Sequence, residues 1–147
     1  MVVTVRNARD RYLTSLLKTA AISYANMLMS PQLVKNLSVK IIIYNNLGRN
    51  AYAFCCPDEI SGRLRSFEIE IKKMRVNRML RLLAHEMVHV KQFAKNELKA
   101  KYFRDGYKTV WHGEICDIDS YLDQPWEIEA FTLEEELLCY FKEEYQY

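Results

Sequence analysis

The segment His85-Glu86-Met87-Val88-His89 carries two imidazoles and a carboxylate at a spacing that suits one metal ion. Two residues four apart in an α-helix point about 40° apart and lie about 6 Å apart along its axis. His85 and His89 can therefore bind one ion from a single helix face. Glu86 is rotated by about 100° from His85, so its carboxylate can hold a water molecule beside the ion and accept its proton. Two ligands and a general base are typical of a zinc hydrolase.

The flanking residues predict that this segment lies in the middle of a long helix, over about residues 74–96. Apolar residues recur along it in steps of four and three: Val76, Leu80, Leu83, Met87, Val90 and Ala94. An unliganded His/Glu/His group would be costly to bury among aliphatic side chains. Metal binding is therefore favoured over the alternative of two structural histidines with Glu86 on the surface.

A catalytic zinc site needs a third protein ligand and leaves its fourth position to water. The extended pattern H-E-x-x-H-x-x-G-x-x-H is absent, because Gln92 and Lys95 stand at its glycine and its third histidine. Two candidates remain for the third ligand. One is Glu127, which follows Pro125 near the start of a predicted helix, and the other is His112, the only remaining histidine.

Three segments bear a family resemblance: His85 to Gln92, Trp111-His112-Gly113 and Pro125-Trp126-Glu127-Ile128-Glu129-Ala130. Together they resemble the small predicted peptidases encoded by bacteriophages, which in turn are similar to minimal gluzincins. The resemblance covers roughly residues 80–131. It implies a zincin-like fold in which two helix histidines and a glutamate from the next helix bind Zn²⁺.

The gluzincin resemblance also implies particular residues for these roles. The ligand glutamate of that family maps onto Glu127 rather than Glu129. Phe131 occupies the place of an aspartate that usually orients a ligand histidine. Glu129, Glu134 or a backbone carbonyl would then take over that orienting role.

SprT-like proteases, which act in association with DNA, are a second resemblance. They join H-E-M-x-H to a downstream His-Gly segment, as in His112-Gly113-Glu114, but the chain lacks their cysteine-rich zinc ribbon and basic tail. If His112 is not a ligand, we expect it to act in catalysis by donating a hydrogen bond to the developing oxyanion. Tyr107 and Tyr121 are alternative donors.

The predicted fold is a single α+β domain over residues 1–147, with the element order α-β-β-β-α-α. An apolar stripe predicts an N-terminal helix over residues 8–30, which Pro31 ends. The active-site helix follows the strands, and a C-terminal helix over residues 126–142 carries the third ligand. Residues 107–116 are expected to form a short strand or a loop between these two helices.

A small, mainly antiparallel sheet of three strands is expected between the first two helices. Its strands lie over residues 39–44, around Tyr52, Phe54 and Cys56, and over residues 65–71. Asn45-Asn46-Leu47-Gly48 predicts a turn, and Pro57-Asp58 with Ser61-Gly62 predicts a loop. The strand over residues 65–71 is a plausible edge to which an extended peptide could add.

Composition excludes several classes of protein. The formal charge is only +2, so neither nucleic acid nor an anionic membrane is expected as the main partner. There is no apolar run of about 20 residues and no signal-peptide pattern, which indicates a cytoplasmic protein, in the host cytoplasm if a phage encodes it. The four cysteines are expected to be reduced thiols, with a metal role for Cys55 or Cys116 as the minor alternative.

The sequence thus predicts a zinc-dependent endopeptidase that hydrolyses a peptide or protein substrate, with Glu86 as general base. The rival prediction is a non-catalytic interaction domain in which zinc only ties two helices together. A fourth protein ligand would favour that rival, whereas a free fourth position favours catalysis. Because so little chain lies beyond the catalytic segment, a regulatory protein partner or a homo-oligomer could select the substrate.

Overall fold

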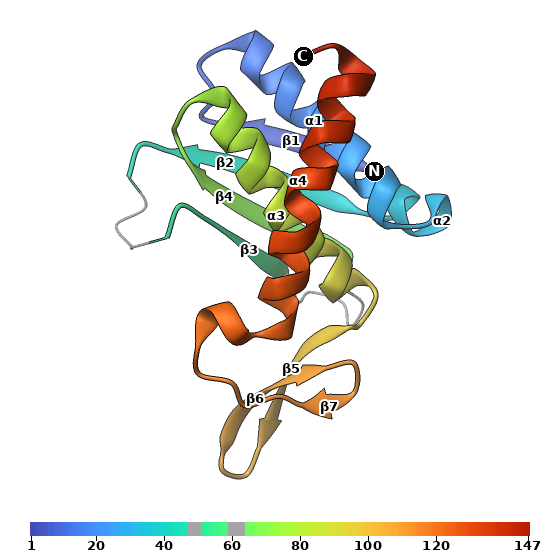
Figure 1. Ribbon diagram of the computed structural model, residues 1–147, viewed down its shortest axis with the longest axis vertical. Helices are drawn as coiled ribbons and strands as arrows, with labels where there is room; N and C mark the ends of the chain where they lie inside the picture. Colours follow the sequence, from blue (N-terminus) through green and yellow to red (C-terminus); the bar gives the residue numbers. More distant parts are fainter. Residues whose placement is uncertain (47–50, 59–63) are drawn as a thin grey trace.

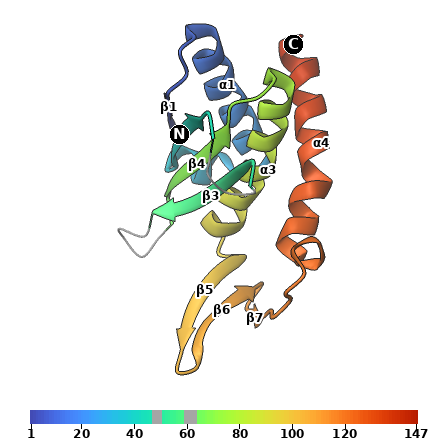
Figure 2. The ribbon, with the colours of Figure 1, turned by 90° about the vertical axis from the view of Figure 1, so that its left-hand side faces the viewer.

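The computed structural model describes residues 1–46, 51–58 and 64–147, which form an α+β fold with two sheets and four α-helices (Figure 1). Two of the long helices, α1 (Arg11–Leu28) and α3 (Val76–Ala94), pack against one face of the larger sheet. The third long helix, α4 (Pro125–Tyr145), packs against α3 on the side away from the sheet (Figure 2). The segment from His85 to His89 therefore lies in the middle layer, between the sheet and α4.

The larger sheet has the strand order β1-β2-β4-β3. Its strands are β1 (Val2–Arg6), β2 (Ser38–Tyr44), β3 (Ala53–Asp58) and β4 (Ser66–Lys72). β1 pairs parallel with β2 and β2 pairs parallel with β4, whereas β3 runs antiparallel to β4. Phe67, Ile69 and Ile71 of β4 are buried, and they alternate with half-buried Glu68 and Glu70. This alternation places one face of the sheet under the helices.

Helix α1 (Arg11–Leu28) begins where the Asp10 side chain accepts a hydrogen bond from the Tyr12 backbone N–H at 2.9 Å. It ends ahead of Pro31, which starts the short helix α2 (Pro31–Lys35). The buried Tyr24 hydroxyl of α1 donates to the Leu80 carbonyl of α3 at 3.3 Å. This bond ties α1 to helix α3 (Val76–Ala94) about one turn before His85.

Helix α4 (Pro125–Tyr145) follows the 3₁₀ turn η1 (Tyr121–Asp123) and runs antiparallel to α3. Glu127, near its start, contacts His89, and Glu135, two turns later, pairs with Arg81 at the other end of α3. The buried side chains of α4 recur at helical spacing: Trp126, Ala130, Leu137, Leu138 and Phe141. Their burial against the rest of the fold keeps α4 aligned along α3.

A smaller antiparallel sheet extends from the C-terminal end of α3 (Figure 1). It consists of β5 (Leu98–Phe103), β6 (Gly106–Trp111) and β7 (Glu114–Ile115). Gly106, at the tip between β5 and β6, has a φ of 121°, which a residue with a side chain rarely adopts. Among the described helices, none combines the length and the apolar character that a membrane crossing requires.

The three long helices and three predicted strands form close to their expected positions, but the predicted sheet layout is wrong in three respects. β1 adds a fourth strand, and the parallel pairings of β1 with β2 and of β2 with β4 make the sheet mixed rather than mainly antiparallel. Pro57 and Asp58 belong to β3 instead of a loop. β4 lies between β2 and β3, so β1 and β3, rather than β4, are the edge strands among the described strands.

The reason for these differences is pairing between distant segments. β1 is only five residues long, and it pairs with a strand about 36 residues later, so local alternation does not reveal it. Pro57 is accommodated because β3 is an edge strand, where a missing backbone N–H costs little. Leu47 and Gly48 of the expected turn, and Ser61-Gly62 of the expected loop, lie outside the described residues.

Candidate metal centre

One cluster of side chains within the described ranges has the arrangement of a metal site: His85, His89 and Glu127. Each offers one ligand atom, and these atoms lie within 4.8 Å of one another. The Glu127 carboxylate lies 3.1 Å from His85 Nε2 through one oxygen and 3.3 Å from His89 Nε2 through the other. Ligand atoms that surround zinc tetrahedrally at about 2.0–2.1 Å are separated by about 3.3 Å. This cluster could hold a metal ion.

The outer nitrogens of both imidazoles are occupied by other side chains. The Glu134 carboxylate lies 2.8 Å from His85 Nδ1, and the Gln92 side-chain oxygen lies 2.8 Å from His89 Nδ1. A neutral imidazole that donates from Nδ1 keeps the lone pair on Nε2. In the neutral form of each ring, these partners favour the tautomer whose Nε2 can bind a metal ion.

The Gln92 amide cannot easily turn around, because its nitrogen is bonded as well. Gln92 is fully buried, and its Nε2 donates to the Trp126 carbonyl and to Glu129, each at 2.9 Å. Lys91 in turn forms an ion pair with Glu129. These bonds tie the C-terminal half of α3 to the first turn of α4, where Glu127 also lies. They hold the second histidine and the third candidate ligand in register.

Burial of several carboxylates in one place changes their protonation. Burial raises the pKa of Glu86 to about 7, although the neighbouring His89 and His85 act in the opposite direction. Burial would also raise the pKa of Glu127, but hydrogen bonds with His85 and His89 outweigh it and lower that pKa to about 2. Close carboxylates require positive charge between them. Although burial acts in the opposite direction, the same carboxylates raise the pKa values of His85 and His89, so protonated imidazoles could supply this charge, and a divalent cation in the cluster would supply it in their place.

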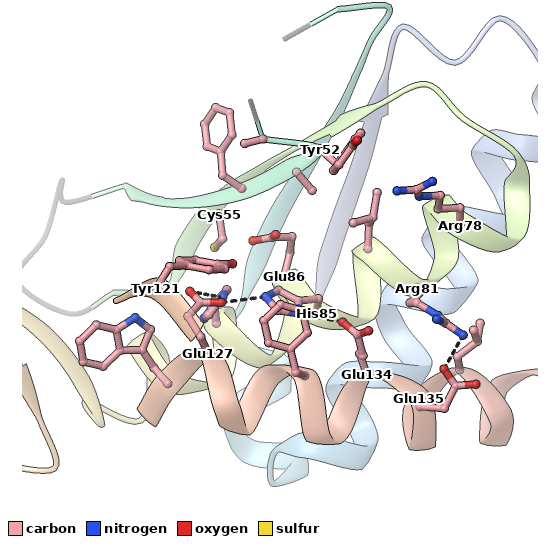
Figure 3. A pocket seen from close by; sticks show the side chains of 18 of the residues that line it. Tyr52, Cys55, Arg78, Arg81, His85, Glu86, Tyr121, Glu127, Glu134 and Glu135 are labelled. Carbon is pink, nitrogen blue, oxygen red and sulfur yellow. Dashed lines mark hydrogen bonds and ion pairs between the residues drawn. The ribbon is translucent and has the colours of Figure 1, made fainter. Parts of the chain in front are cut away.

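The cluster opens into a cleft of about 1330 Å³ between β3, α3, η1 and α4 (Figure 3). Glu86 points into this cleft toward β3 and has no hydrogen bond among the described residues. Tyr121, on η1, also lines the cleft, and its hydroxyl helps to lower the pKa of Glu127. A substrate in the cleft would therefore meet the three candidate ligands, the Glu86 carboxylate and a tyrosine hydroxyl together.

His112, which the sequence suggests as a catalytic residue or as the third ligand, lies elsewhere. It is exposed in the turn between β6 and β7, with a φ of 46°, and its ring contacts Trp111. Neither His112 nor Tyr107 lines the cleft, so Tyr121 is the one of the three proposed oxyanion donors that does. The structure brings Glu127 rather than His112 to the two helix histidines.

The cysteines considered as ligands do not join the described cluster either. Cys55 lies in the cleft wall opposite Glu86, and burial raises the pKa of its thiol, which keeps it protonated. Cys116 follows β7, away from the cleft. No fourth protein ligand therefore appears among the described residues, and the fourth position of an ion held by the cluster would face the cleft.

Sequence reasoning missed the role of Gln92 and left Glu134 as one of three alternatives. Gln92 follows His89 by three residues, which places the two on the same helix face and could have suggested the bond. Glu134 is 49 residues from His85, and only the packing of α4 reveals its partner.

Comparison with known proteins finds no matching family model, no matching curated protein and no matching solved structure.

Proposed function

We propose that this protein is a zinc-dependent endopeptidase, with His85, His89 and Glu127 as the metal ligands and Glu86 as the general base. The observation that supports this most directly is the geometry of the cluster. Three buried ligand atoms converge from two helices, and the remaining position opens into the cleft beside a further carboxylate. Zinc is the proposed metal because sites of two imidazoles and one carboxylate with an open position are typical of catalytic zinc.

The chain's own residues divide the proposed reaction between them. When bound, zinc would lower the pKa of a coordinated water and polarise the scissile carbonyl. Glu86 accepts a proton from the attacking water and returns it to the leaving amine, a role that suits a carboxyl group with a pKa near 7. The Tyr121 hydroxyl lies at the cluster and can donate a hydrogen bond to the developing oxyanion.

The edge strand β3 offers a place for the substrate backbone. Among the described strands, β3 pairs only with β4, and residues 51–55, at its N-terminal end, line the cleft. An extended peptide could add to the free edge of β3 through backbone hydrogen bonds. Its scissile bond would then lie between β3 and the metal ligands of α3.

The interaction-domain alternative requires a closed metal site. The free fourth position supports catalysis over this alternative, because a purely structural zinc ion is normally enclosed by four protein ligands. The exposed location of His112 gives no support to its use as that fourth ligand.

The test is to compare the purified protein with a Glu86→Gln variant on a mixture of unlabelled peptides analysed by mass spectrometry. We expect one bound zinc ion in both proteins, cleavage only by the unchanged protein, and loss of that cleavage after chelation. Glu135→Gln serves as a control, because Glu135 is an exposed carboxylate on the same cleft wall. Peptide cleavage that persists in Glu86→Gln would refute the assignment of the base.

A further inference from the structure

The two ends of the cleft differ in chemistry. Phe93, Leu98 and Trp126 line the end beyond His89, and none of them carries a charge. All lysines and arginines in the described lining lie at the opposite end: Arg78, Arg81 and Lys142. Figure 3 shows Arg78 and Arg81 on one side of the view, with Arg81 beside Glu135, and Glu127 and Tyr121 toward the other side. A bound peptide would therefore meet an apolar region on one side of the metal centre and a cationic region on the other.

The cationic region has more positive charge than its own carboxylates neutralise. Arg81 forms an ion pair with Glu135. The Arg78 guanidinium instead lies over the Tyr52 ring, 4.8 Å from its centroid, and no ion pair between described residues involves Arg78 or Lys142. Glu134 is bonded to His85 and belongs to the metal centre. This end of the cleft thus has an excess of two positive charges, which favours an anionic partner.

The direction of a bound peptide follows from the orientation of β3. Tyr52, just before β3, contacts Arg78 in the first turn of α3, and Cys55 lies opposite Glu86 farther along the helix. β3 therefore runs in the same direction as α3. Antiparallel pairing is slightly more stable than parallel pairing. The N-terminal part of a peptide paired antiparallel to β3 therefore lies at the apolar end of the cleft, and its C-terminal part lies at the cationic end.

The spacing along α3 indicates which substrate residues meet the cations. The proposed metal lies between His85 and His89. From their midpoint, Arg81 and Arg78 are six and nine residues back along α3, or about 9 and 13 Å, and Phe93 is six residues forward, or about 9 Å. An extended peptide advances about 3.3 Å per residue. The cations are thus about three to four residues from the scissile bond, and Phe93 is about three residues from it on the other side.

We infer that the preferred substrates are peptides with a large apolar side chain about three residues before the cleaved bond and an acidic residue three or four positions after it. This inference rests on the proposed function for the position of the cleaved bond. The recognition itself depends only on the cleft, so binding can be measured in a protein that does not turn over.

The first measurement is fluorescence anisotropy with zinc-loaded Glu86→Gln protein and two labelled ten-residue peptides. Both contain Leu-Phe at the fourth and third positions before the central bond, and they differ in having Glu or Gln at the third and fourth positions after it. The acidic peptide should bind about fivefold more tightly, which corresponds to the about 1 kcal/mol that a favourable exposed ion pair contributes. Equal affinities, or no measurable binding of either peptide, would overturn the inference.

Charge-reversal variants in the same background locate the effect. Arg78→Glu combined with Lys142→Glu should abolish or invert the preference for the acidic peptide. Lys73→Glu combined with Arg75→Glu changes the net charge equally at exposed positions outside the cleft and should preserve the preference. If both double variants weaken binding of the acidic peptide equally, the preference arises from the long-range effect of net charge. That result would refute recognition of the acidic residues by the cationic end of the cleft.

The second measurement separates this inference from the proposed function. The zinc-loaded active protein is incubated with a proteome-derived peptide library, and cleavage sites are identified by mass spectrometry. Acidic residues should be enriched three or four positions after the bond. Cleavage without this enrichment, or with acidic residues enriched before the bond, refutes the inference but leaves the peptidase intact. Selective binding of the acidic peptide without any cleavage refutes the peptidase and supports the recognition.

Discussion

Removal of the Glu134 carboxylate should weaken zinc binding without unfolding the protein. Glu134 lies on α4, outside the three proposed ligands, and its carboxylate accepts a hydrogen bond from His85 Nδ1 at 2.8 Å. The side chain of His85 is 7% exposed and that of Glu134 is 15% exposed, so water competes little for this bond. In Glu134→Ala, the His85 ring loses the partner that holds Nε2 toward the metal position.

The magnitude follows from the nature of this bond. A hydrogen bond to a charged group contributes about 1.5–3 kcal/mol, and each 1.4 kcal/mol corresponds to about a tenfold change in affinity. The zinc dissociation constant should therefore rise by about 10- to 150-fold. This range agrees with the about 10- to 100-fold effect usual for groups that orient a ligand histidine.

The assay is competition for zinc against a chromogenic chelator at constant pH, with circular dichroism as a check on folding. Glu135→Ala is the matched control, because the neighbouring carboxylate pairs with Arg81 on the surface and contributes at most about 1 kcal/mol to folding. Zinc affinity in the control should be unchanged. A dissociation constant for Glu134→Ala within about threefold of the original value, with the fold intact, would refute the proposed role of Glu134 or of His85 as a ligand.

Three further outcomes are expected from the same geometry. Gln92→Leu should lower the free energy of unfolding, measured by urea denaturation, by about 2–4 kcal/mol. The reason is that His89 Nδ1, the Trp126 carbonyl and Glu129 lose a buried partner. A change below about 1 kcal/mol would contradict this. Glu127→Gln should weaken zinc binding by more than about 100-fold, because loss of a ligand should cost more than the about 10- to 100-fold typical of a group that only orients a ligand. Equal zinc affinity in the original protein and this variant would exclude Glu127 as a ligand. His112→Ala should leave the zinc dissociation constant unchanged within about twofold, because His112 is exposed and lies outside the cluster. Competition with a chelator will reveal any larger effect.

The amino-acid sequence by itself determined the local part of the candidate site. The period of apolar residues around His85 and His89 predicts a buried helix, and within one helix a four-residue spacing sets the relative directions of two side chains. The start of α4 was predictable for a similar reason, because Pro125 suits the first turn of a helix. Glu127 was thereby placed near a helix start, although its role as the favoured third ligand came from a family resemblance.

Only the tertiary structure decided which side chains from other elements reach this helix. The antiparallel packing of α4 on α3 brings Glu127 and Glu134 to His85 across 42 and 49 residues of chain, while it leaves His112 outside. The insertion of β4 between β2 and β3 likewise makes β3 the edge that borders the cleft. Local periodicity shows which face of a helix or strand is buried, but it does not specify the partner that covers it. That partner is selected by the packing of the whole core, to which distant segments contribute.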